Sequence, residues 1–117
     1  MAMNPTDFDG AVPVDGYGPG FFRVGGKVFH GPVLATGEGC RDWAGLQDRA
    51  ALLDLAGRID VLFVGTGAQI AHLPADLAQD LEQAGIAVEA MASPTAARTY
   101  NVTLSEGRRV ACALLPV

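Results

Sequence analysis

The segment Asp60–Gly67 constrains the fold more than any other part of the chain. Its four consecutive apolar residues, Val61–Val64, predict a strand buried on both faces, because a half-exposed strand would alternate apolar and polar residues. The turn Gly65–Gly67 follows where a parallel strand passes into a helix, which is where open α/β sheets bind ligands. The turn lacks the third glycine of a dinucleotide-binding motif and the Gly-Lys-Ser/Thr of a P-loop. It therefore indicates a candidate site without naming a reaction.

The residues after this turn predict a βαβ unit. Apolar residues recur at helical spacing and polar residues lie between them, as in a helix with one buried face. The apolar positions are Leu73, Leu77, Leu81 and Ala84. Gly85 is expected just past the helix end, and residues 86–89 predict a strand that the crossover helix places parallel to the first.

The C-terminal part predicts one more helix and one more strand. Ser93 is expected to be the N-cap and Pro94 the first helical residue of a helix that runs to about Glu106. Its inward positions are Ala97, Tyr100 and Leu104. Residues 109–115 are apolar at odd and even positions, so this strand is expected in the centre of the sheet.

The N-terminal half predicts short strands around glycine turns. These strands are expected at 21–24, 27–30 and 33–35, and Gly25-Gly26 joins the first two as a tight hairpin. Residues 36–41 are expected to form a loop. Leu46, Ala50 and Leu53 have helical spacing and predict a helix over roughly 46–56, with Gly57 just past its end.

These elements predict one compact three-layer α/β domain with a mixed central sheet, an N-terminal β-hairpin and a βαβ unit. The domain is expected over residues 15–117. Residues 1–14 are rich in Asp, Pro and Gly, lack a periodic pattern and are expected to be disordered or loosely attached.

Composition excludes several classes of partner. The chain has 117 residues, half of them hydrophobic, and no apolar run approaches the ~18 residues of a membrane span. Its net charge of −5 and scattered arginines provide no basic stripe for nucleic acid. The histidines and cysteines are too few and too widely spaced to predict a metal or a disulfide, and no cofactor is predicted. The N-terminus has no secretory pattern, so a cytoplasmic location is expected, with attachment to the inner membrane through a partner left open.

The chain resembles a family that contains the mitochondrial respiratory complex I assembly factor 3, its adipogenesis-associated relative in animals, and uncharacterised bacterial and archaeal proteins. The matching pieces are residues 20–24, 31–34, 60–67, 73–74, 85–91, 97–101 and 106–110, in the family's order. The resemblance implies the three-layer α/β fold and, for the mitochondrial members, a non-enzymatic role in assembling NADH:ubiquinone oxidoreductase. This chain lacks a mitochondrial presequence and its residue usage is typical of bacteria, so we expect a bacterial member.

The glycine turn, the end of the next parallel strand and the start of the last helix are expected at the same end of the sheet. The candidate ligand-binding residues are Gly65, Thr66, Gly67, Glu89, Met91, Ser93, Arg98, Thr99, Tyr100 and Asn101. Free N–H groups at a helix start favour an anion, and the glycines, expected at positive φ, would let it approach the backbone. In the structural alternative, the glycines only permit the turn, Arg98 pairs with Glu89 or a carbonyl, and Asn101 joins loops.

The sequence leaves two functions open. The first is a non-enzymatic interaction or assembly factor, with respiratory-complex subunits or other assembly factors as partners. The second is a domain that binds a small anion, or a weak enzyme, and uses the Gly65–Gly67 turn and the helix that carries Arg98. Catalytic residues are not identified, because no order of Ser, His and Asp matches a triad and no spacing brings two carboxylates together. A pocket of several hundred Å³ with convergent polar groups near Gly65 would favour the second function.

Overall fold

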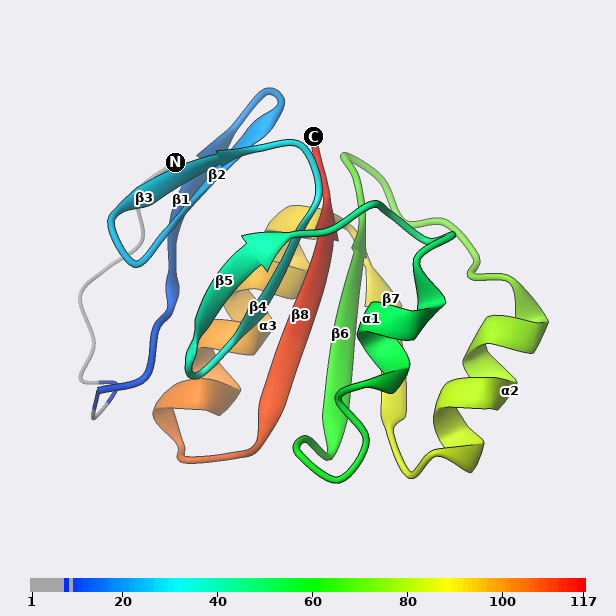
Figure 1. The fold of residues 1–117 in the computed structure, drawn as a ribbon. Helices are drawn as coiled ribbons and strands as arrows, with labels where there is room; N and C mark the ends of the chain where they lie inside the picture. The colour runs from blue at the N-terminus through cyan, green and yellow to red at the C-terminus, as the bar shows by residue number, and fades with distance from the viewer. Residues whose placement is uncertain (1–7, 9) are drawn as a thin grey trace.

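The structure, a computed structural model, describes residue 8 and residues 10–117, and its elements form two sheets and three helices (Figure 1). The strands are β1 (Val14–Gly18), β2 (Phe21–Val24), β3 (Lys27–His30), β4 (Val33–Thr36), β5 (Gly39–Asp42), β6 (Val61–Thr66), β7 (Ala87–Met91) and β8 (Val110–Leu115). The helices are α1 (Arg49–Leu53), α2 (Ala75–Gln83) and α3 (Ser93–Ser105). The first three strands form an antiparallel sheet, and the others form a mixed sheet in the order β5-β4-β8-β6-β7. The predicted α/β class, hairpin and mixed sheet are confirmed.

The strand pairing confirms the predicted βαβ unit. β6 is parallel to both β7 and β8, and β4 is antiparallel to β8 and β5. β8 lies in the middle of the five strands, as its apolar residues on both faces predicted. Gly65 pairs with Met91 and Thr66 with Leu115, so the three parallel strands end together.

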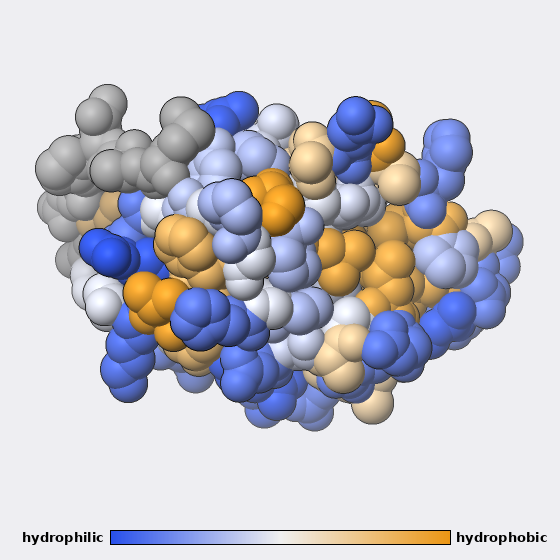
Figure 2. Space-filling model, turned by 90° about the horizontal axis from the view of Figure 1, so that it is seen from above, coloured by the Kyte–Doolittle hydropathy of each residue, from blue (hydrophilic) through white to orange (hydrophobic). Residues whose placement is uncertain are grey.

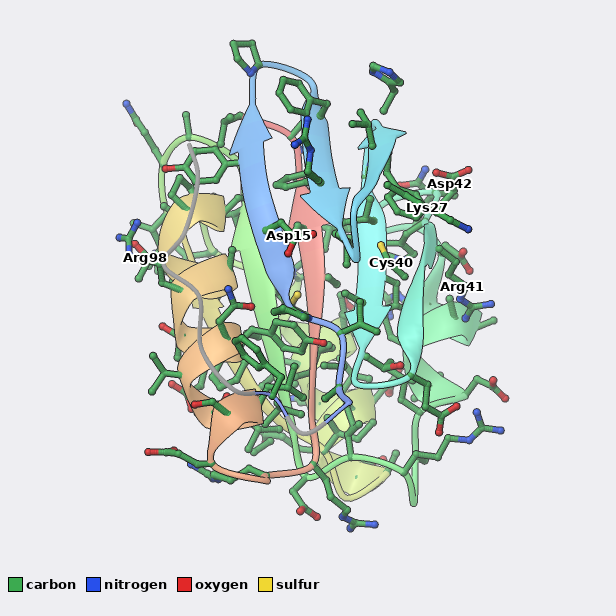
Figure 3. The ribbon with its side chains drawn as sticks, turned by 90° about the vertical axis from the view of Figure 1, so that its left-hand side faces the viewer. Asp15, Lys27, Cys40, Arg41, Asp42 and Arg98 are labelled. Atoms are coloured by element: carbon green, nitrogen blue, oxygen red, sulfur yellow. The ribbon has the colours of Figure 1, made fainter. Side chains whose placement is uncertain are left out.

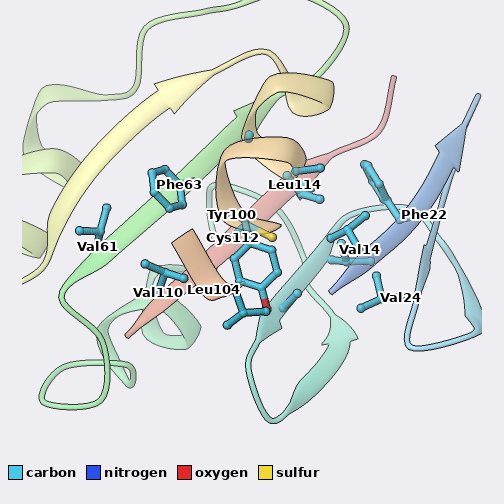
Figure 4. Close-up of a cluster of buried hydrophobic side chains, with 14 residues drawn as sticks. Val14, Phe22, Val24, Val61, Phe63, Tyr100, Leu104, Val110, Cys112 and Leu114 are labelled. Carbon is cyan, nitrogen blue, oxygen red and sulfur yellow. The ribbon is translucent and has the colours of Figure 1, made fainter. Parts of the chain in front are cut away.

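Each face of the large sheet has its own apolar core, which gives the three layers seen in Figure 1. Leu62 and Val64 pack toward α1 and α2, together with Trp43. Val61 and Phe63 pack on the opposite side, in the cluster that contains Tyr100 of α3 and the inner side chains of the small sheet (Figure 4). A strand between two layers has no solvent-facing side, which explains the unbroken apolar run in β6.

Two strands form in segments that are rich in glycine and polar residues and were not predicted to be strands. β5 occupies the second half of the segment predicted as the loop 36–41, because hydrogen bonds to β4 impose the strand on a polar edge segment. β1 pairs with β2 and begins at Val14, which is fully buried. Of the segment 1–14 that the sequence predicts to be loosely attached, residues 1–7 and 9 lie outside the described residues.

The first helix is shorter than the predicted 46–56 segment, and its buried face differs. It begins after Asp48, whose side chain accepts a hydrogen bond from the Ala51 amide at 3.3 Å and so caps the helix. Leu52 is fully buried and Leu55 nearly so, whereas Ala50, predicted to face inward, is exposed. A helix of little more than one turn is oriented by its tertiary contacts more than by its own periodicity.

Candidate functional site

The two glycines of the β6 turn are required for different reasons. Gly67 has φ +99°, in the left-handed region, as predicted. Gly65 does not have a left-handed φ, so the prediction for that residue is wrong. A Cβ at Gly65 would instead lie 2.7 Å from the Ser93 Cα and 2.8 Å from Leu114 Cδ2. The absence of a side chain at this position lets the start of α3 pack directly on β6.

Ser93 joins three segments at this point. Its side chain is fully buried, accepts a hydrogen bond from the Gly67 amide at 2.9 Å and donates one to the Leu115 carbonyl at 2.6 Å. Its own amide donates to the Gly67 carbonyl at 2.8 Å. The prediction that Ser93 is the N-cap is wrong: it is the first helical residue, and Ala92 is the N-cap. The Ser93 hydroxyl is directed to the ends of β6 and β8 rather than to the amides of its own helix.

Thr66 holds the loop that follows β6. Its hydroxyl lies 2.8 Å from the Gln69 carbonyl and 3.3 Å from the Met91 carbonyl, and it accepts a hydrogen bond from the Ala71 amide at 2.9 Å. These contacts fold residues 66–71 back toward the end of β7. Thr66 therefore positions both the loop and the neighbouring strand.

The remaining predicted residues lie in different surroundings. Arg98 lies on the outer side of α3 and points away from the sheet (Figure 3), and its guanidinium lies 3.5 Å from the Thr95 hydroxyl. Thr99 donates back to the Thr95 carbonyl at 2.8 Å. Glu89 is exposed on β7 and forms no ion pair with Arg98 or any other described residue.

Tyr100 and Asn101 attach the N-terminal strand to α3. Tyr100 is fully buried, its hydroxyl donates to the Val12 carbonyl at 3.1 Å, and burial raises the pKa of its phenol. The Asn101 side chain donates to the Val14 carbonyl at 2.8 Å and accepts from the Val14 amide at 2.9 Å. This pair of bonds agrees with the structural alternative, in which Asn101 joins distant segments.

The two thiols are placed as small apolar side chains. Cys112 is fully buried, and burial raises the pKa of its thiol. Burial, followed by the nearby Asp42 carboxylate, raises the pKa of the half-buried Cys40 thiol to about 12. Both cysteines are free, and thiols with raised pKa values carry little of the nucleophilic thiolate. The described residues contain no group of three or more His, Cys, Asp or Glu side chains placed to hold a metal.

An apolar groove that sequence reasoning missed lies beside the turn. It has a volume of about 360 Å³ and is lined by the loop 70–73, by Ala78 of α2 and by Val88 and Ala90 of β7. Ile70, at its rim, is 69% exposed, the highest value among the large apolar side chains of the described residues. Seen from above in Figure 2, apolar side chains gather around the region of α2 and the preceding loop, and hydrophilic ones border them. The one available signal was an isolated isoleucine in a loop that has no periodic pattern.

Comparison with known proteins identifies the family. Residues 14–115 match the model of a family described as a protein of unknown function, DUF498/DUF598. The chain belongs to this family. An uncharacterised protein of Rhodobacter capsulatus is 53% identical over 117 residues, which cover all of this chain and 94% of that protein.

Two further similar proteins extend the comparison. The zebrafish protein named NADH dehydrogenase [ubiquinone] 1 alpha subcomplex assembly factor 3 is 33% identical over 107 residues, which cover 86% of this chain and 62% of that protein. The predicted resemblance to complex I assembly factor 3 is thereby confirmed, although the chain spans less than two thirds of that relative. A crystal structure from Bordetella parapertussis superposes with a TM-score of 0.81 at 36% identity and covers 92% of this chain and 97% of that one.

Unfolding in different salts tests whether an anion binds at the α3 start of this DUF498/DUF598 member, as the sequence suggested. The Ser93 amide and hydroxyl already bond within the chain, and Arg98 points outward. We therefore expect sulfate and chloride at matched ionic strength to raise Tm equally. A ligand that binds only the native state would raise the free energy of unfolding by about 2.7 kcal/mol when its concentration is 100 times its Kd. A sulfate effect of that size that is lost in Arg98→Ala would instead establish the anion site.

Proposed function

We propose that this DUF498/DUF598 member is a non-enzymatic protein-interaction factor that supports assembly of a respiratory NADH dehydrogenase. The observation that carries the proposal is the exposed apolar groove around Ile70. Exposed apolar side chains gathered in a concave surface are typical of protein interaction sites. The name of the zebrafish relative supplies the kind of assembly.

The contacts of the nucleophilic side chains favour binding over catalysis. The Ser93 hydroxyl donates to a backbone carbonyl, and the Thr66 hydroxyl lies within hydrogen-bond distance of two carbonyls. The groove's polar side chain is His72, which is exposed, and its other lining residues are apolar. A nucleophilic enzyme needs a base within hydrogen-bond reach of its nucleophile, and these hydroxyls have carbonyl partners instead.

The proposed location, at the membrane surface, depends on binding to a partner protein. None of the helices in the described part of the chain has the length and apolar character needed to cross a bilayer. We infer that the chain works in the cytoplasm and reaches the inner membrane through the respiratory subunits that it binds.

Deletion of the gene in the source organism tests this function. We expect membranes of the deletion strain to lose most NADH:quinone oxidoreductase activity, and we expect subassemblies of the complex to accumulate on native gels. A tagged copy of the chain should restore activity and comigrate with one of these subassemblies. Normal activity and a normal gel pattern in the deletion strain would rule out the assembly role.

A further inference from the structure

The edge strand β7 has an unused side. It is the last strand of the large sheet, and among the described residues it pairs only with β6. The Ala87 amide donates to the Asp60 carbonyl, on the β6 side, at 2.9 Å. Because backbone groups alternate in direction along a strand, the N–H and C=O groups of Val88 and Ala90 point away from β6. The outer edge of β7 therefore offers donors and acceptors for another strand.

The apolar groove lies on one face of this edge. Val88 and Ala90 pair with Leu62 and Val64, whose side chains face the α2 side of the sheet, and the same two β7 residues line the groove. Ile70 and Leu73, in the loop between β6 and α2, form part of the wall of the groove. A strand added along β7 would place every second side chain in this groove.

The opposite face of the edge carries an unpaired charge. Glu89 pairs with Phe63, which faces the α3 side, so the Glu89 side chain lies on the face away from the groove. It is exposed, and none of the described basic side chains forms an ion pair with it. The side chains of an added strand that do not enter the groove would lie beside this carboxylate.

We propose that an extended segment of a partner protein binds β7 as a sixth strand. Its alternate apolar side chains fill the groove around Ile70, and a Lys or Arg between them faces Glu89. Backbone hydrogen bonds to Val88 and Ala90 provide affinity, and the groove and the carboxylate provide specificity. This inference rests on the proposed protein-binding function and names the chemistry of the partner segment.

Charge favours a partner over a second copy of this chain. Glu89 is the middle residue of β7, so symmetric antiparallel pairing of two β7 strands about that residue would put two carboxylates directly opposite each other. Like charges at opposed positions destabilise a sheet. Each copy also carries a net charge of −5, which opposes self-association and favours a basic segment.

Selection from a displayed random peptide library, with peptides of about ten residues, tests the proposal, since that length exceeds a typical strand. We expect selected peptides to alternate apolar residues with residues that include Lys or Arg. Synthetic copies of these peptides should slow amide hydrogen exchange at Val88 and Ala90, because only an added strand bonds those outward groups. Failure to select such peptides, or binding that leaves both amides unprotected, would overturn the proposal.

Matched variants identify the surface. Ile70→Ser should weaken binding of the selected peptides at least tenfold, whereas Val102→Ser, which changes a 58% exposed valine on α3 outside the groove, should leave binding unchanged. Glu89→Lys should reverse the preference from basic to acidic peptides. Equal binding by the Ile70→Ser and Val102→Ser variants would overturn the proposal. So would a wild-type dimer in sedimentation that Ile70→Ser dissociates, because a second copy would then occupy the edge.

The peptide experiments and the gene deletion test different claims, so either proposal can be rejected while the other is kept. Peptide binding with the expected protection, in a protein whose deletion leaves respiration normal, would keep the added strand and reject the assembly role. A deletion defect that the doubly substituted Ile70→Ser, Glu89→Lys chain rescues fully would keep the assembly role and reject β7 as the docking edge.

Discussion

We expect Gly65→Val to lower the free energy of unfolding by about 3 kcal/mol or more, and Tm by roughly 10 °C or more. A Cβ at this position would lie 2.6 Å from Ser93 Oγ, 2.7 Å from Ser93 Cα and 2.8 Å from Leu114 Cδ2. The Cα atom belongs to the first turn of α3, so relief requires the helix itself to move. That movement would also pull the Ser93 hydroxyl away from the Gly67 amide and the Leu115 carbonyl. Denaturant and thermal unfolding followed by circular dichroism measure the loss.

The matched control is a glycine with similar backbone freedom and more space. Gly37 also lacks a left-handed φ, and the nearest atom to a Cβ built there is Leu104 Cδ1 at 3.4 Å, an ordinary contact distance. Gly37→Ala should therefore change stability by no more than about 0.5 kcal/mol, whereas Gly65→Ala should already destabilise clearly. Equal stability of the two alanine variants would show that α3 does not depend on close contact at Gly65.

The second large effect is expected for Ser93→Ala. The substitution leaves the Gly67 amide, in a buried residue, without its hydrogen-bond acceptor, and it removes the donor to the Leu115 carbonyl. An unsatisfied buried polar group costs about 1–3 kcal/mol, so we expect a loss within that range. We also expect faster amide hydrogen exchange at Gly67, because the end of β6 is held to α3 through this hydroxyl.

Ser105→Ala is the control for the general cost of removing a serine hydroxyl from α3. Ser105 lies in the last turn, and its hydroxyl donates to the Val102 carbonyl at 2.7 Å at an exposed site. Water replaces such a bond, so the change should stay within about 0.5 kcal/mol. If Ser93→Ala were as stable as Ser105→Ala, the buried hydroxyl would not hold the three segments together.

The candidate site was predictable in its place but not in its contacts. Gly65–Gly67, the end of β7 and the start of α3 were expected at one end of the sheet, and they lie there because the parallel strands end together. The partners of Ser93 were not predictable, because a serine before a proline has the same local pattern whether it caps its own helix or bonds to Leu115, 22 positions away. The groove was missed for a similar reason, since its lining comes from a loop, a helix and a strand that only the fold brings together.

The sequence by itself determined the central layer of this protein. The apolar residues of Val61–Val64 and of the last strand have no polar side to turn to water, so both strands must lie between two covering layers. Tertiary structure decided the parts without such a pattern. β1 is a strand because β2 pairs with it and because Asn101, 87 positions from Val14, bonds both backbone groups of that residue. Burial on both faces leaves a record in consecutive residues, whereas a hydrogen bond or a close contact between distant segments depends on positions that only the folded chain defines.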